Sequence, residues 1–223
     1  MNSRLAILVS GRGSNLQALI DAIAGSQLHA EIVGVFSDKP GAAALQRVPA
    51  PLRWAADARQ FPNRMEFDRC LADAISVAEP DWVICAGYMR ILGVDFIRRF
   101  AGRLLNIHPS LLPKYRGLHT HARAIEAGDT EHGASVHFVT EELDAGAVIA
   151  QATIPVIAGD TPDDLAVRLL PQEHRLLTAV AQLAVAGRLA ERDGNVEIDG
   201  HRLFQPLRLD CEGNFPLRPA SGA

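Results

Sequence analysis

Apolar residues in the first half of the chain form short continuous runs, separated by segments in which they recur every third or fourth position. Runs of this kind are typical of strands buried on both faces of a sheet. They lie at 5–10, 31–37, 82–86 and 104–108. The helical spacing at 14–24 and 63–78 predicts two helices between the runs. Strands that alternate with helices favour an α/β fold with a Rossmann-like, doubly wound, mostly parallel sheet and flanking helices.

The second half has a different pattern, which predicts a mixed C-terminal portion of the sheet. Residues 133–139 and 148–157 alternate between apolar and polar positions, so we expect strands that are more exposed on one face. Thr161 precedes a proline and two acids, which is typical of a helix start, and we expect that helix to run through 165–186.

The C-terminal part of the chain carries a hairpin signal and then loses its periodicity. Asp199-Gly200 lies between two runs with strand propensity, a pattern that favours a tight turn. Beyond Pro206 the chain contains Gly, Pro and Arg without a period, so we expect a loose tail.

Composition narrows the functional classes. Of the 223 residues, 48% are hydrophobic and 22% charged, which fits a globular protein. The formal net charge of −4 argues against a nucleic-acid partner, because non-specific binding relies on Lys and Arg. We find no leader and no apolar stretch long enough to span a bilayer, and so expect a cytoplasmic protein without a membrane partner. Either a monomer or a homodimer is compatible with the sequence.

The cysteines and histidines give little support to a disulfide or metal site. Cys70, Cys85 and Cys211 form no Cys-x-x-Cys pair. The histidines at 119–121 and 132–137 could be considered as ligands, but no cysteines or acids complete a tetrahedral set at the usual spacing. We therefore expect no metal.

Candidate chemistry lies at the end of the run 104–108. Asn106 and His108 are two residues apart, so in a strand their side chains share one face. An amide donor beside an imidazole suits acyl transfer, in which an oxyanion forms and protons move. A downstream carboxylate such as Asp144 would fix the imidazole tautomer and favour its charged form. From the sequence alone, Asp144 also reads as an ordinary turn residue before Ala145-Gly146.

A second candidate lies at the end of the first run, where Gly11-Arg12-Gly13-Ser14-Asn15 precedes a helix. Free backbone amides at a helix N-terminus bind phosphate. The third glycine of a dinucleotide fingerprint is missing, because Leu16 occupies that position. A plain strand-to-helix turn that needs glycine explains the segment equally well.

The segment 106–113 (NIHPSLLP) resembles the signature of the folate-dependent formyltransferases. With 10–19 (SGRGSNLQAL), it resembles the branch that formylates 5-phosphoribosylglycinamide in de novo purine (IMP) biosynthesis, and the resemblance extends from about 5 to about 187. It implies an enzyme with small-molecule substrates that moves the formyl group of 10-formyltetrahydrofolate, its co-substrate, to the substrate amine.

The resemblance also implies roles for individual residues. Asn106 would bind near the formyl group, His108 would donate the proton, and Asp144 would be its partner. The implied binding residues fall into three groups: Gly13, Ser14 and Asn15 for the substrate phosphate, Glu173 for the substrate amine, and Arg64, Met89, Arg90, Ile91, Leu92 and Asn106 for the folate. Arg64 and Glu173 could equally be solvated helix positions, and 89–92 could be ordinary core.

These assignments predict one formyltransferase domain over 1–223. Its phosphate-binding Rossmann-like half covers about 1–100, its catalytic and folate-binding half about 101–190, and its hairpin and tail about 191–223. The alternatives are another formyltetrahydrofolate-dependent enzyme such as a methionyl-tRNA formyltransferase, which would need a further nucleic-acid-binding domain, and a non-catalytic nucleotide-binding module. The module leaves Asn106, His108 and Asp144 without a purpose.

Overall fold

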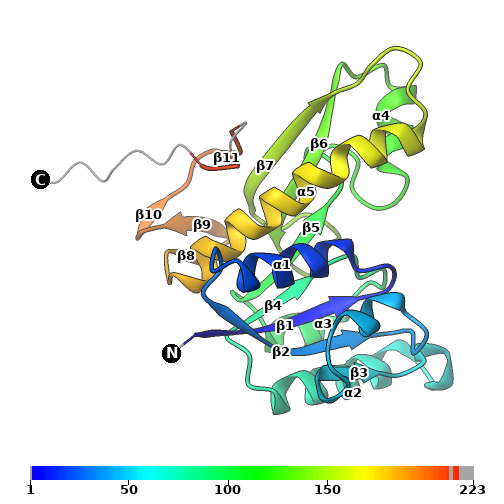
Figure 1. The fold of residues 1–223 in the computed structure, drawn as a ribbon, viewed down its shortest axis with the longest axis vertical. Helices are drawn as coiled ribbons and strands as arrows, with labels where there is room; N and C mark the ends of the chain where they lie inside the picture. The colour runs from blue at the N-terminus through cyan, green and yellow to red at the C-terminus, as the bar shows by residue number, and fades with distance from the viewer. Residues whose placement is uncertain (1, 211–212, 216–223) are drawn as a thin grey trace, which may run out of the picture.

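The computed structural model describes residues 2–210 and 213–215 of the chain (Figure 1). The strands and α-helices, in chain order, are β1 (Ser3–Val9), α1 (Ser14–Ala24), β2 (Ala30–Ser37), β3 (Arg53–Ala55), α2 (Arg64–Val77), β4 (Trp82–Cys85), α3 (Val94–Arg99), β5 (Leu104–His108), α4 (Thr120–Glu126), β6 (Glu131–Phe138), β7 (Val148–Pro155), α5 (Pro162–Val185), β8 (Leu189–Arg192), β9 (Asn195–Ile198), β10 (His201–Arg202) and β11 (Leu207–Arg208). Three short 3-10 helices, η1 (Ala43–Arg47), η2 (Ala50–Leu52) and η3 (Ala58–Gln60), flank β3.

The central sheet has eight strands in the order β11-β7-β6-β5-β4-β1-β2-β3. Neighbours from β3 to β5 are parallel, whereas β6 is antiparallel to both β5 and β7. A separate antiparallel sheet has the order β10-β9-β8. The expected α/β fold, with a mostly parallel doubly wound sheet and a mixed C-terminal portion, is confirmed.

Helices cover both faces of the sheet. Alternate residues of β1 pack against the helices on opposite faces. Leu5, Ile7 and Val9 pack on one face with α1 and α5, while Ala6 and Leu8 pack on the other with α2 and α3. Successive side chains of a strand point to opposite faces, so a strand buried on both must be apolar throughout. The long helix α5 crosses β6 and β7 and contacts α1 (Figure 1).

The strands and helices predicted from the sequence are present, with shifts of a few residues at their ends. The Asn63 side chain caps α2 by accepting from the Glu66 backbone N–H, and Thr161 forms a capping box with Asp164 at the start of α5. The hairpin at Asp199-Gly200 joins β9 to β10. The short elements β3, α3 and α4 were not predicted, because a few residues are too short to display a period.

The expectation of a more exposed strand is wrong for 133–139, because β6 is buried from His132 to Phe138, and it holds only in part for 148–157, because β7 is buried at 149–152 but exposes Thr153 and Pro155. Apolar and polar side chains do alternate along β6, but the loop at 109–114, rather than solvent, covers the polar face of the strand. The Ser135 hydroxyl donates to Ser110 O, and Gln151 Nε2 donates to Leu112 O. Buried polar side chains are tolerated when they are hydrogen-bonded in this way.

The expectation of a loose tail beyond Pro206 is wrong for the residues that directly follow this proline. Leu207–Arg208 forms β11, which pairs in parallel with Ala150 and Gln151 of β7. This pairing covers the backbone groups that an edge strand exposes. The rest of the predicted tail at 211–212 and 216–223, with Cys211, lies outside the described residues. No helix in the described part of the chain has the length and apolar character needed to cross a membrane.

Candidate active site

The site begins where β1 and β4 end side by side at the centre of the sheet. The chain leaves β1 through α1 towards β2, whereas β4 lies on the other side of β1, so the strand order reverses here. Such a switch point opens a crevice beyond the carboxyl ends of the strands. The end of β5, with His108, is next in the row.

A cavity of about 450 Å³ lies at this edge of the sheet. The residues that line it include Met89–Leu92, Asn106–Pro109, Gly117–His121, His137 and Asp144. All three predicted catalytic residues therefore border one space, although Asp144 is far from the other two in the sequence. The exposed side chains of Met89 and Ile91 contribute apolar surface.

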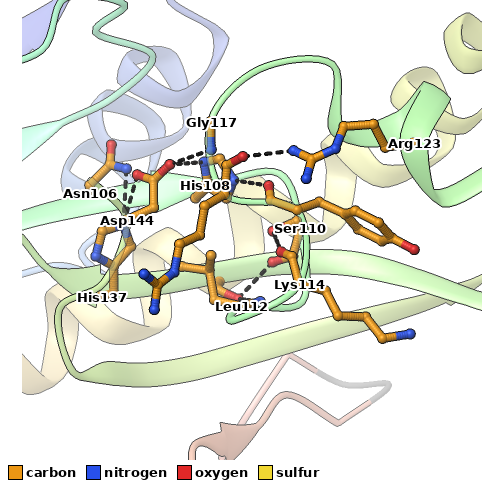
Figure 2. A network of polar contacts seen from close by, with 12 residues as sticks. Asn106, His108, Ser110, Leu112, Lys114, Gly117, Arg123, His137 and Asp144 are labelled. Carbon is orange, nitrogen blue, oxygen red and sulfur yellow. Dashed lines mark hydrogen bonds and ion pairs between the residues drawn. The ribbon is translucent and has the colours of Figure 1, made fainter. Parts of the chain in front are cut away.

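The buried imidazole of His108 has an oxygen at each ring nitrogen (Figure 2). Its Nε2 lies 3.0 Å from the backbone oxygen of Tyr115, and its Nδ1 lies 3.5 Å from Asp144 Oδ2. A carbonyl and a carboxylate can only accept hydrogen bonds, so each ring nitrogen of His108 faces an acceptor.

Asn106 is oriented by a second histidine, His137, which the sequence reading did not assign to the site. His137 Nδ1 donates to Phe138 O at 2.7 Å, which leaves Nε2 as an acceptor for Asn106 Nδ2 at 3.1 Å. Burial lowers the pKa of His137, so its ring is neutral and can accept. His137 Nε2 also lies 3.7 Å from Asp144 Oδ1. We call Asn106, His108, His137 and Asp144 the polar cluster.

Asp144 is both a turn residue and a member of the polar cluster. Its φ of 47° is left-handed, which an aspartate tolerates in a turn. Its Oδ2 accepts a hydrogen bond from the Gly117 backbone N–H at 2.9 Å (Figure 2). A Cβ on Gly146 would lie 1.9 Å from Phe138 O, so only glycine lets the turn pack this closely. The two sequence readings of Asp144 are therefore compatible.

The glycine turn, residues 11–15, leaves the N-terminus of α1 without a side-chain cap. Gly13 has φ 75°, and a Cβ there would lie 2.5 Å from Ala44 Cβ. Arg47 lies against the turn, since its Nε donates to Arg12 O at 2.8 Å. Free amides at a helix start, with a guanidinium beside them, suit an anionic group.

Glu173 of α5 reaches the start of α1. Asn15 Nδ2 donates to Glu173 Oε2 at 3.2 Å. Burial raises the pKa of Glu173, and the Asn15 hydrogen bond opposes that effect. The structure thus brings Glu173 to the glycine turn, although 158 positions separate it from Asn15 in the sequence.

Arg64 does not line the cavity beside the polar cluster, unlike the other predicted folate-binding residues. As the first residue of α2, it lines a neighbouring cavity of about 470 Å³ between α2 and α3, with Asp68 and Gly93. Arg90 lines the first cavity, and its guanidinium lies 5.0 Å from the centre of the Phe67 ring.

His121, His132 and Cys85 are at least partly buried, and none of them belongs to the polar cluster. His121 Nδ1 and His132 Nε2 lie 2.9 Å apart, and burial lowers the pKa of both rings. Cys85 is buried in β4, which raises the pKa of its thiol to about 12. Among the described residues, no group of three or more His, Cys, Asp or Glu side chains is arranged to hold a metal ion.

Sequence reasoning missed His137 and Arg47. His137 was considered only as a metal ligand, because its place beside Asn106 follows from the pairing of β6 with β5, which the sequence pattern does not record. Arg47 lies in a short 3-10 helix without a motif, so its place beside the glycine turn follows only from the fold.

Comparison with known proteins identifies the class that this fold and cavity define. The formyl transferase family model matches residues 3–181, and the chain belongs to that family. Its curated relatives include the phosphoribosylglycinamide formyltransferases of Escherichia coli K12 and Haemophilus influenzae. The first is 48% identical and the second 43%, over 89% and 90% of this chain and 95% of each relative. A solved structure, the phosphoribosylglycinamide formyltransferase of Coxiella burnetii in complex with CHES, is 41% identical with a TM-score of 0.85, covering 91% of this chain and 96% of that chain.

Proposed function

We propose that this protein transfers the formyl group of 10-formyltetrahydrofolate to the amine of 5-phosphoribosylglycinamide, a step of de novo purine biosynthesis. The observation that carries the proposal is the polar cluster, which lies on the wall of a cavity at the switch point of the sheet. Membership of the formyl transferase family and the names of the relatives support the same reaction.

The chemistry that we propose starts with attack of the uncharged substrate amine on the formyl carbon. As the new carbon–nitrogen bond forms, the π electrons of the carbonyl move onto its oxygen, which becomes an oxyanion. One N–H of the Asn106 amide can donate to this oxyanion, while the other N–H donates to His137. The tetrahedral intermediate then collapses, the bond from carbon to the folate nitrogen breaks, and the proton lost by the amine goes to that nitrogen. The products are the formylated glycinamide and tetrahydrofolate.

His108 moves the proton in this scheme. Its Nε2 meets Tyr115 O in the structure, so we propose that the imidazole exchanges this carbonyl for the oxyanion or the departing nitrogen when substrates bind. Asp144, anchored by Gly117 N–H, holds the Nδ1 side of the ring. A fixed partner limits the tautomers of the ring and its orientation.

The substrates would lie across the switch point, and residues from both halves of the chain would contact each of them. In the half at about 1–100, Gly13, Ser14 and Asn15 at the start of α1 would hold the substrate phosphate, with Arg47 adding positive charge. Glu173 would receive the substrate amine end from across the turn. Residues 89–92 would line the folate pocket, and Arg64 would contact the folate only where the ligand extends into the neighbouring cavity between α2 and α3.

The test follows the release of tetrahydrofolate by absorbance in purified protein with 10-formyltetrahydrofolate, with and without phosphoribosylglycinamide. Release that depends on the glycinamide supports the proposal, because acceptor and donor are then both identified. Release without the glycinamide would indicate a hydrolase, and no release under either condition would contradict the proposed transfer.

A further inference from the structure

The loop at 87–92, which connects β4 to α3, forms one wall of the cavity beside the polar cluster. Two of its residues, Met89 and Ile91, expose most of their side chains to the cavity side of the loop. A loop that presents its backbone and side chains to a ligand has to be held in place by the structure behind it. Two buried carboxylates, Asp38 and Asp68, hold this loop at its two ends.

The first end is held through Ser10. The backbone N–H of Met89 donates to the Ser10 hydroxyl oxygen at 2.9 Å, and that hydroxyl donates to Asp38 Oδ1 at 2.6 Å. Ser10 and Asp38 are both buried. The hydroxyl thus has an acceptor for its own proton and accepts from the loop, which fixes its rotation.

The second end is held by Asp68, which comes from the opposite side of the cavity wall, in α2. The backbone N–H of Gly93 donates to Asp68 Oδ2 at 2.7 Å, although Asp68 is only 4% exposed. Burial raises the pKa of Asp68, while the Gly93 N–H and the charges of Arg64 and Arg90 favour its ionised form. Asp68 therefore holds the loop end by one hydrogen bond, and the charges of Arg64 and Arg90 lie close enough to act on its carboxylate.

Asp68 lies near Arg64 and Arg90, the two arginines that we have assigned to folate binding. Arg64 and Asp68 line the neighbouring cavity between α2 and α3, and Arg90 belongs to the loop that lines the cavity beside the polar cluster. A buried carboxylate is costly unless it is paired and hydrogen-bonded, and Asp68 Oδ1 is buried without a hydrogen-bond partner, so this position carries a cost in stability. An apolar side chain of similar size would fill the same volume between α2 and the loop without that cost.

We propose that Asp68 is a positioning residue for the formyl-donor subsite, because its hydrogen bond from the Gly93 backbone N–H fixes one end of the loop that carries residues 89–92. The inference rests on the proposed function, since it assumes that the loop binds 10-formyltetrahydrofolate. It assigns Asp68 no contact with the substrate phosphate or with the polar cluster. Its effect should therefore be confined to one of the two substrates.

The experiment compares four variants of the full chain. Asp68→Ala removes the acceptor and the charge, whereas Asp68→Asn keeps an acceptor for the Gly93 N–H and removes only the charge. Gly93→Ala disturbs the same contact from the other side, because its Cβ would lie 2.8 Å from Asp68 Oδ2 while the backbone, at φ −78° and ψ 161°, accepts alanine. Asp73→Ala is the matched control, since Asp73 is an exposed aspartate on the same helix that pairs with Arg99.

Two readouts separate positioning from general structure. The first is the KM for each substrate, and the second is the Kd for tetrahydrofolate, measured by calorimetry without the glycinamide. We expect Asp68→Ala and Gly93→Ala to raise the donor KM and the tetrahydrofolate Kd by about ten-fold, the size expected from losing one charge-assisted hydrogen bond. The glycinamide KM should change by less than about two-fold, Asp68→Asn should be intermediate, and Asp73→Ala should match the unmodified protein.

Unchanged donor KM and tetrahydrofolate Kd in Asp68→Ala and Gly93→Ala would overturn the inference alone, and so would equal increases in the KM of both substrates. If Asp68→Ala fails to fold, Gly93→Ala decides the matter by the same criteria. An unmodified protein that neither binds tetrahydrofolate nor releases it would overturn the proposed function and this inference together.

Discussion

The glycine turn and the polar cluster lie at the same edge of the sheet but are built in opposite ways. The turn is one contiguous segment whose useful groups are backbone amides at the start of α1. The cluster consists of side chains that come from β5, β6 and the turn that carries Asp144. The turn should therefore tolerate changes of side chain but not of backbone conformation, whereas each member of the cluster should be sensitive to substitution.

Substitutions in the polar cluster should have the largest effects on activity. We expect Asn106→Ala and His108→Ala each to lower kcat by about 10²–10³, because each removes a group that stabilises the oxyanion or moves the proton. Steady-state kinetics and thermal unfolding would be measured together. The matched control is His201→Ala, which changes an exposed histidine outside the cavity and should leave kcat unchanged. Near-full turnover in either cluster variant would remove that residue from the mechanism.

Asp144→Asn should have the next largest effect. The asparagine can still accept from Gly117 N–H, so the turn should persist, but the charge beside His108 is lost. We expect kcat to fall by roughly ten- to hundred-fold, since general acid–base catalysis depends on the correct ring tautomer. Asp129→Asn provides the comparison, because Asp129 pairs with Lys114 rather than with the cluster. Equal kinetics for the two variants would show that the charge of Asp144 does not assist His108.

The same contrast explains what the sequence could predict. Strands β1, β2, β4 and β5 and helices α1, α2 and α5 were predicted because a buried parallel strand and an amphipathic helix have periods that a local window reveals. The cover on the polar face of β6 was not predicted, because it comes from the loop at 109–114, and no local pattern records that packing. Similarly, Asn106 and His108 were identified from their spacing in one strand, whereas His137 required knowledge that β6 pairs with β5.

Gly13→Ala tests the glycine turn, whose useful groups are backbone amides. Alanine at φ 75° is strained, and its Cβ would meet Ala44 Cβ at 2.5 Å, so the turn must shift. We expect the KM for phosphoribosylglycinamide to rise by about ten-fold and the free energy of unfolding to fall by about 1–3 kcal/mol. Gly11→Ala is the matched control, since no atom lies within 4 Å of a Cβ there. If both variants bind the substrate equally well, the conformation of the turn is not what holds the phosphate.

The smallest effect should be a dependence of the free energy of unfolding on pH, caused by the buried imidazole of His132. Burial lowers the pKa of His132 to about 4, and its neighbours include His121, Asp129 and His108. Between about pH 6.5 and 4 the unfolded chain binds more protons than the folded one, so the free energy of unfolding should fall as the pH falls, by at most about 1.4 kcal/mol per pH unit from this group. Thermal unfolding at pH 7 and pH 5 should show a smaller loss in His132→Gln than in His201→Gln. An identical loss would mean that His132 does not contribute.

The most direct test of the central claim is to follow an isotopically labelled formyl carbon by NMR. The protein would be mixed with labelled 10-formyltetrahydrofolate and phosphoribosylglycinamide, beside the His108→Ala variant. We expect the label to appear on the glycinamide nitrogen with the unmodified protein and to remain on the folate with the variant over the same period. Label released as free formate, or transferred at equal rates by both proteins, would contradict the account.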